Sequence, residues 1–510
     1  MSTTLLAPNA ADKAKSEQSG ATRGVIGPLL RRIFSFPVAL SGLLSALAVL
    51  TVRERFDDPD MWWHLKTGQL IWTTRAIPSI DLFSYTAARH ALVPHEWLSQ
   101  VAIYGAYAWG GNSGLMLLFC GLAAAVLIAG YALCSLYSGN AKVAFLGSLV
   151  VFVFATIGFS IRPHLLGYLL LILEMVLIHL GRSRDPRWFF ALPPLFAIWI
   201  NCHGSFFLGL IMGGVILFSG FFNFQVASLV AERWSPRSRR MLLLSLALST
   251  AALLLNPSGI KQVLYPLDTM LHQPINLASV QEWQPLQLSS QRGVCFLVVL
   301  AAVFLLLALQ KADLRLDELL LLALGIWLAG SHERMIFVFG ILAAPILTRM
   351  LAASWENYDA RADRAWPNAV LLALSLLTVI WAFPSAQSLA SQIEEKNPVK
   401  AVEFIRSHNL TGPMLNEYQY GGYLIWAMPE HPVFIDGRAD LYEWAGILGQ
   451  YTSWSTLQSD PNSLLDKFHI QFCLLSPQSP MARVLPLLHG WQSVYADPNS
   501  VIFERIPQAR

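Results

Sequence analysis

Residues 36–65 read FPVALSGLLSALAVLTVRERFDDPDMWWHL, an apolar run followed directly by an acidic and tryptophan-rich segment. A membrane-spanning helix needs about 20 mostly apolar residues, and the first part of this stretch fits that requirement. The second part places three carboxylates, two tryptophans and one histidine in residues 57–65. The stretch therefore predicts a first membrane span that leads into an unusually polar loop.

The composition of the whole chain agrees with a membrane protein. The 510 residues are 55% hydrophobic and only 13% charged, whereas soluble domains carry about 25% charged residues. The net charge of +3 is too small to indicate a nucleic-acid partner. The five cysteines are scattered without a CxxC spacing, so neither a disulfide scaffold nor a zinc site is indicated.

Hydropathy predicts about eleven spans between residues 34 and 383, centred near residues 44, 124, 151, 172, 194, 213, 248, 301, 324, 342 and 375. Lysine and arginine gather in alternate loops, which by the positive-inside rule predicts a cytoplasmic N-terminus. Residues 1–33 are polar and are expected to form a disordered cytoplasmic tail. An odd number of spans then places the C-terminus outside. We predict a multi-pass protein of the inner (plasma) membrane.

This topology collects the unusual polar clusters on one side. The loop 53–98, the short segments 162–164, 201–205 and 331–335, the loop 256–292 and the C-terminal region all face outward. Residues 384–510 are expected to form a small extracytoplasmic α/β domain, with a helix within 397–409, strands within 413–418, 432–438 and 470–477, and a terminal hairpin within 491–505. The predicted fold is therefore an α-helical polytopic membrane protein with a small C-terminal α/β domain.

The first loop carries the strongest site signal. After Pro59 the pattern predicts a helix on which Asp60 and His64 share a face, because they are four residues apart. Trp62 and Trp63 are expected to anchor this helix among lipid headgroups. Asp60 has two open interpretations, a catalytic carboxylate or an ordinary helix N-cap.

An acidic loop after the first span, a short surface helix and an acidic residue where the loop returns to the membrane resemble the GT-C superfamily of polytopic glycosyltransferases. Protein O-mannosyltransferases, the aminoarabinose transferase of lipid A and oligosaccharyltransferases belong to this superfamily. In several members the loop reads roughly P-D-E-x-x-Y-A-E, to which Pro59-Asp60 is similar; Met61 departs from it. The resemblance implies that Asp60 is the catalytic aspartate and that Glu96 corresponds to a second acidic site. It also implies a polyprenyl-phosphate-linked sugar donor and inversion at the anomeric carbon.

The chemistry of such a transfer needs a base that takes the proton of the acceptor hydroxyl. We expect Asp60 in this role, with Asp58 and Glu96 as acidic neighbours. Asp58, Asp60 and His64 could alternatively hold a divalent cation, magnesium or manganese, since these metals prefer oxygen ligands.

Further outer-face residues are candidates for binding substrate: Arg162, His164, His203, His332, Arg334 and Arg438. A cation at membrane depth needs an anionic partner, so Arg162 is expected to bind a lipid phosphate or to pair with Asp57. Arg334 could likewise bind phosphate, while Asp436 next to Arg438 favours a structural salt bridge. The expected partners are membrane lipid, a polyprenyl-phosphate-linked donor and an acceptor that the sequence does not name.

Two other functions remain open at this stage. A transporter or flippase would carry its polar residues near the midplane of the membrane, where Glu174 and His179 are the main candidates. A non-catalytic scaffold for envelope assembly would not depend on Asp60.

Overall fold

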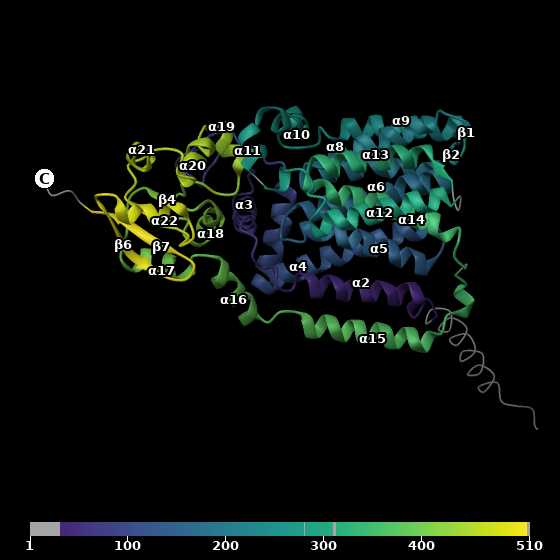
Figure 1. Ribbon diagram of the computed structural model, residues 1–510, viewed down its shortest axis with the longest axis horizontal. Coiled ribbons are helices and arrows are strands. Elements are labelled where there is room, and N and C mark those ends of the chain that lie inside the picture. The colour runs from purple at the N-terminus through teal and green to yellow at the C-terminus, as the bar shows by residue number, and fades with distance from the viewer. Residues whose placement is uncertain (1–30, 280, 310–312, 357, 507–510) are drawn as a thin grey trace, which may run out of the picture.

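The structure of the protein, a computed structural model, describes residues 31–279, 281–309, 313–356 and 358–506. All but the last three residues of the predicted tail 1–33 lie outside these residues. A long helical bundle carries a smaller α/β domain at one end (Figure 1). We call this end of the bundle the domain end.

The bundle consists of eleven helices in the described part of the chain: α2 (Phe36–Val52), α4 (Trp97–Ser138), α5 (Ala141–Ala155), α6 (His164–Ser183), α7 (Leu192–Cys202), α8 (Phe206–Ser219), α9 (Pro236–Ala252), α12 (Gln291–Ala308), α13 (Leu316–Ser331), α14 (Ile336–Ala352) and α15 (Ala365–Ala382). Each predicted span centre falls within one of them. The length and apolar character of six helical segments among the described residues make the chain an integral membrane protein.

The predicted number of about eleven spans is not confirmed. Among the described residues, six helical segments are long and apolar enough to cross a membrane, and two apolar helices are shorter. A helix of 11 residues such as α7 is only about 16 Å long, about half the apolar thickness of a bilayer. Hydropathy marks where apolar helices lie, but it does not show whether each one crosses alone.

The longest helix, α4, contains a break that hydropathy could not show. Its backbone leaves helical geometry at Gly110 and Gly111, where Gly111 has a φ of +58°. This left-handed conformation is accessible to glycine at little cost. The break separates a first segment, beside the first loop, from the long membrane segment that follows.

Between α2 and α4 the first loop folds into helix α3 (Met61–Thr74), as predicted. Figure 1 shows α3 between the bundle and the α/β domain. Trp62, expected in the headgroups, is instead 3% exposed, because its ring packs edge-on against Tyr423 of the α/β domain at 5.2 Å. Helix α3 is thus an internal connector between the two parts of the protein, and the prediction for Trp62 is wrong.

The C-terminal domain contains a four-stranded sheet in the order β4-β5-β7-β6. The strands are β4 (Met414–Asn416), β5 (Phe472–Leu475), β6 (Trp491–Ala496) and β7 (Val501–Arg505). β4 and β5 are parallel, and β6 and β7 form the predicted antiparallel hairpin. The surrounding helices are α16 (Ala386–Lys396), α17 (Val399–Ser407), α18 (Gly421–Ala427), α19 (Ala439–Trp444), α20 (Leu448–Ser455), α21 (Pro461–Lys467) and α22 (Pro480–Val484).

The strand predicted within residues 432–438 is wrong. This segment contributes only an isolated bridge between Val433 and Ser84 of the first loop. The Asn416 side chain takes the place of a neighbouring strand: its amide donates to the carbonyl of Ile435 at 2.7 Å and accepts from the N–H of Phe434 at 2.8 Å. The segment is therefore extended but does not belong to the sheet, so its chain can turn toward the bundle.

Loop residues 79–92 are attached to the C-terminal domain. The N–H of Tyr85 donates to the carbonyl of Val433, and the N–H of Val433 donates to the carbonyl of Phe83. Ala87 is fully buried within the hydrophobic core of the domain. The first loop thus belongs structurally to both parts of the protein.

Candidate functional site

The acidic segment after α2 makes a tight turn before α3. The N–H of Asp60 donates to Oδ1 of Asp58 at 2.9 Å, which folds the chain around Pro59. Asp60 stands at the N-cap position of α3, yet its side chain makes no capping hydrogen bond. The N-cap interpretation of Asp60 therefore does not account for its carboxylate, which points elsewhere.

Arg162 brings the two carboxylates together. Its Nε donates to Oδ2 of Asp58 at 2.6 Å, and its Nη1 lies 3.0 Å from Oδ2 of Asp60. Arg162 precedes α6, in a turn that is tied to the first loop because Arg55 donates to the carbonyl of Thr156 at 2.7 Å. The sequence predicted a lipid phosphate or Asp57 as the anionic partner of Arg162; within the protein its partners are Asp58 and Asp60, not Asp57.

The surroundings drive the pKa values of the two carboxyls apart. Burial favours the neutral form of both, but at Asp58 the charge and hydrogen bond of Arg162, together with hydrogen bonds from Ser160 and the N–H of Asp60, outweigh it and lower the pKa of that carboxyl. At Asp60 burial prevails over Arg162, and the negative charges of Asp58 and Asp436 add to it, so its pKa is raised from 3.8 to about 6. Neighbouring carboxylates with separated pKa values are typical of acid–base sites.

A second group forms around Glu96, at the start of α4. Nδ1 of His64 and Nε2 of His95 lie 3.9 and 3.8 Å from Glu96 Oε2, and Nε2 of His203 lies 3.9 Å from Oε1. Burial raises the pKa of Glu96 and lowers the pKa of both His64 and His203. The predicted residues Glu96 and His203 therefore meet here.

His64 belongs to this second group and not to the Asp60 group, although the predicted helix placed it on the face of Asp60. Its Nδ1 lies 3.2 Å from the side-chain nitrogen of Gln100 on α4. Within the described residues, no set of three histidine, cysteine or acidic side chains is arranged to hold a metal ion. The predicted ligands Asp58, Asp60 and His64 are thus not brought to one point.

Arg334 and His332 reach the domain end from the turn between α13 and α14. The guanidinium of Arg334 lies 4.4 Å from the centre of the Trp283 ring, a cation–π contact. Nδ1 of His332 bonds to the carbonyl of Trp283 at 2.7 Å, and Glu333 pairs with Arg292 at 2.9 Å. Trp283, which sequence reasoning did not single out, positions both predicted residues.

Two of the predicted substrate-binding residues, His164 and Arg438, have partners within the protein. Nε2 of His164 bonds to the carbonyl of Gly158 in the turn before α6. The buried guanidinium of Arg438 donates to Asp436 at 2.8 and 2.6 Å and to Asp81 at 2.6 Å. The salt bridge expected for Asp436 is therefore present, and Arg438 links the C-terminal domain to the first loop.

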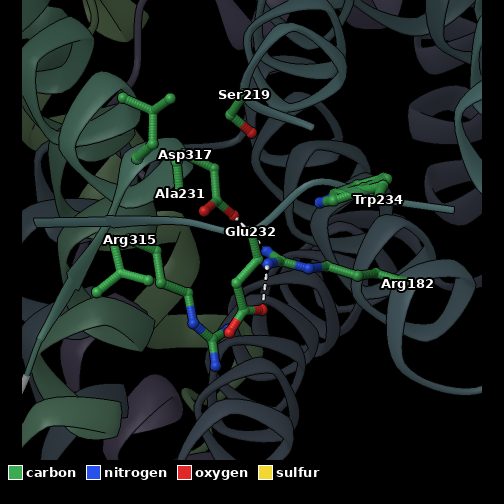
Figure 2. A pocket seen from close by; sticks show the side chains of 9 residues that line it. Arg182, Ser219, Ala231, Glu232, Trp234, Arg315 and Asp317 are labelled. Carbon is green, nitrogen blue, oxygen red and sulfur yellow. Dashed lines mark hydrogen bonds and ion pairs between the residues drawn. The ribbon is translucent and has the colours of Figure 1, made fainter. Parts of the chain in front are cut away.

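A separate small pocket lies at the opposite end of the bundle, beside the three-stranded sheet of β1 (Phe224–Val226), β2 (Leu229–Ala231) and β3 (Leu314–Arg315). Arg182 pairs there with Asp317 at 2.7 Å and lies over the Trp234 ring (Figure 2). The pocket has about 10 Å³ of accessible space, room for about one water molecule. Arg182 follows His164 on α6 by 18 residues, or ~27 Å, so this pocket is remote from the candidate site.

Glu174, the midplane candidate of the transporter hypothesis, is also separate from the site. Its carboxyl is fully buried and lies against Gly209 of α8, where an added Cβ would be 2.4 Å from Oε2. It shares no contact with the Asp60 or Glu96 groups among the hydrogen bonds and ion pairs of the described residues.

Comparison with known proteins supplies information on the fold. No protein-family profile matches the sequence, and no curated protein matches it. A crystal structure of the oligosaccharyltransferase of Archaeoglobus fulgidus, tethered with an acceptor peptide containing the NVT sequon, superposes with a TM-score of 0.57 at 12% identity over 94% of this chain and 75% of that chain.

The same archaeal oligosaccharyltransferase (AglB) in complex with an inhibitory peptide and a dolichol-phosphate gives a TM-score of 0.51 at 12% identity, over 92% of this chain and 74% of that chain. It has also been crystallised with zinc and sulfate. ArnT of Cupriavidus metallidurans, bound to undecaprenyl phosphate, gives 0.48 at 13% identity, over 91% and 97% of the two chains. The predicted resemblance to the GT-C superfamily is confirmed at the level of the fold.

Proposed function

We propose that this protein is a membrane glycosyltransferase that transfers a sugar from a polyprenyl-phosphate donor to an acceptor hydroxyl on the extracytoplasmic side. The observation that carries the proposal is the Asp60 carboxylate, partly buried beside Arg162 and Asp58 at the domain end of a GT-C fold. The acceptor is a lipid, glycan or protein of the cell envelope.

In the proposed mechanism Asp60 is the general base. The acceptor oxygen attacks the anomeric carbon while its proton passes to Asp60. The bond from the anomeric carbon to the phosphate oxygen breaks, and polyprenyl phosphate leaves with the electron pair. A single displacement of this kind inverts the anomeric configuration. A pKa of about 6 keeps Asp60 ionised at neutral pH while leaving it more basic than an ordinary aspartate, which suits a general base.

Arg162 and Asp58 prepare this base. Arg162 holds one oxygen of Asp60 at 3.0 Å, which restricts rotation of the carboxylate and directs it toward the acceptor. Asp58, with its lowered pKa, stays ionised and fixes Arg162 in turn. Removing Asp58 would therefore misplace the base without removing it.

The donor phosphate is assigned to the Arg334 side of the site. Arg334 is carried on the short turn between α13 and α14 and is supported by Trp283. A guanidinium is suited to phosphate because it offers several donors in one plane. The Glu96 group, with His64, His95 and His203, lies between the first loop and α7 and would contact the sugar or the acceptor.

A divalent cation does not fit the predicted set of ligands. Oδ2 of Asp58 and Oδ2 of Asp60 both face the guanidinium of Arg162, so a positive charge already lies where a shared cation would bind. His64 faces Gln100 and Glu96 instead. No step of the mechanism is assigned to a metal.

The test compares purified wild-type, Asp60→Asn and Asp57→Asn proteins reconstituted with radiolabelled polyprenyl-phosphate hexoses and cell-envelope lipids. Asp57 is exposed and provides the matched control three residues away. Transfer should be lost in Asp60→Asn, by about 100-fold or more, and retained in Asp57→Asn. Equal transfer by all three proteins would remove Asp60 from the mechanism. Absence of transfer by the wild type across the donor panel would favour a transporter or a scaffold.

A further inference from the structure

The C-terminal domain touches the Asp60 turn through two glycines. A Cβ at Gly437 would lie 1.7 Å from Oδ1 of Asp60, and a Cβ at Gly422 would lie 2.2 Å from the carbonyl oxygen of Pro59. Real Cβ atoms do not approach other heavy atoms so closely, so any side chain at either position would displace its neighbour. The backbone of Gly437 therefore packs directly on the carboxylate.

We infer that the C-terminal domain forms one wall of the Asp60 site, and that Gly437 is a positioning residue that holds Oδ1 of Asp60 while Oδ2 faces Arg162. The inference rests on the proposed function for its kinetic readout, but the geometry stands without it. Arg162 comes from the bundle and Gly437 from the domain, so the carboxylate is held between the two parts of the protein.

The turn that carries Gly437 is itself rigidly supported. Arg438 bonds through its three guanidinium nitrogens to Asp436 and Asp81, and the Tyr442 hydroxyl donates to Asp436 at 2.5 Å. These residues are buried. The turn is thus fixed to the first loop at Asp81 and to α19 at Tyr442, and it cannot move away from Asp60 without breaking these bonds.

A further glycine lets the same turn approach its own domain. A Cβ at Gly421 would lie 2.1 Å from the carbonyl oxygen of Ile435. Gly421 and Gly422 are adjacent, so one contacts the turn that holds Gly437 and the other contacts Pro59. Gly421-Gly422 and residues 434–438 therefore have one common role, which is to let the C-terminal domain pack closely against residues 59–60.

The domain also contributes to the charge around Asp60. Arg162 from the bundle favours the ionised form of Asp60, while Asp58 from the first loop and Asp436 from the domain disfavour it. Burial and, to a smaller extent, the negative charge of Asp60 raise the pKa of Tyr418, also from the domain, so this hydroxyl stays neutral. Asp436 thus acts on the protonation of Asp60 across the interface, without touching substrate.

The experiment uses full-length Gly437→Ala, with Gly330→Ala as the matched control because an added Cβ at Gly330 meets nothing within 4 Å. The first readout is the dependence on pH of Asp60 labelling by a carbodiimide, which reacts with protonated carboxyls, followed by peptide mass spectrometry. The second readout is kcat and KM for transfer. Thermal unfolding shows whether each variant folds.

We expect Gly437→Ala to lower kcat by about 100-fold, as a misplacement of about 1 Å can do, with little change in KM for the donor. We also expect the midpoint of Asp60 labelling to move by about 0.5 pH units or more. Gly330→Ala should match the wild type in both readouts. Wild-type kcat together with a wild-type labelling midpoint in folded Gly437→Ala would overturn the inference.

A second variant covers the case in which Gly437→Ala does not fold. Asp436→Asn keeps the shape of the side chain and removes its charge, so the labelling midpoint of Asp60 should move to lower pH. An unchanged midpoint in folded Asp436→Asn would count against the role of the domain. Because labelling needs no substrate, a wild type that lacks transferase activity would refute the proposed function and leave this inference open to its own test.

Discussion

Asp58 and Asp60 are two residues apart, yet their replacement by asparagine should change stability in opposite directions. Ionised Asp60 is disfavoured in the folded protein, since its pKa is raised from 3.8 to about 6. At about 1.4 kcal/mol per pKa unit, the difference corresponds to at most ~3 kcal/mol of lost stability above pH 6. Asp60→Asn should therefore raise the free energy of unfolding by about 1–3 kcal/mol at pH 8, while abolishing transfer.

The sign follows from proton binding. Between pH 3.8 and about 6 the folded state holds a proton on Asp60 that the unfolded state has released, so wild-type stability falls as pH rises through this window. Near pH 4, where wild-type Asp60 is protonated, the gain from Asp60→Asn should vanish. Asp58 has a lowered pKa because of Arg162, so it stabilises the folded state at neutral pH and Asp58→Asn should destabilise it.

The assay is thermal or denaturant-induced unfolding of the wild type and the two variants in the same detergent, from pH 4 to pH 8. The reasoning is refuted if Asp60→Asn is less stable than the wild type at pH 8. It is also refuted if the gain in the free energy of unfolding does not change with pH, because ionised Asp60 would then not destabilise the folded protein. Equal effects of the two substitutions would refute the division of roles within the pair.

Further predictions concern the other charged groups. Arg438→Gln should cost about 3–5 kcal/mol in unfolding experiments, because Asp436 and Asp81 would stay buried without their cation; Arg406→Gln, which removes a half-exposed pair with Glu430, should cost less than about 1 kcal/mol. Arg334→Gln should raise KM for the lipid donor by about 10-fold or more with little effect on unfolding, and an unchanged KM would place the phosphate elsewhere. The kcat/KM profile should rise with pH through a single ionisation near 6. Transfer should survive treatment with EDTA, because Arg162 faces the carboxylates of the predicted metal site, and a loss that magnesium or manganese restores would contradict this assignment.

Local patterns account for what could be predicted from the sequence. Runs of apolar residues marked each helix of the bundle, and the segment after Pro59 has enough helical character to specify α3. The hairpin of β6 and β7 could be predicted because a residue of the turn itself stabilises the turn. Oδ1 of Asp497 accepts hydrogen bonds from the N–H groups of Asn499 and Ser500 at 2.8 and 2.7 Å. These features depend on residues that are close together in the chain, so they can be predicted from one sequence.

The site could be predicted only in part, for the opposite reason. Asp60 and Glu96 stood out through the resemblance of the first loop, and Arg162 because a cation at membrane depth needs an anionic partner, but the pairing of Arg162 with Asp58 depends on how the bundle packs. The bond of Arg438 to Asp81 and the contact of Gly437 with Asp60 join residues more than 350 positions apart. No periodicity or spacing encodes such contacts, and the segment 432–438 was mistaken for a strand because Asn416 satisfies its backbone from the side.

The contact of Gly437 with Asp60 has a consequence for the order of biosynthesis. A chain is synthesised from its N-terminus, so the acidic turn is made early and its second wall last. Until residues 433–438 have emerged and folded against the bundle, Tyr85 and Val433 cannot bond, Arg438 cannot reach Asp81, and the Asp60 carboxylate has only the bundle beside it. A partly synthesised or truncated protein would hold the correct aspartate in an unfinished environment, so the finished site itself reports that the C-terminal domain has been made and has packed against the bundle.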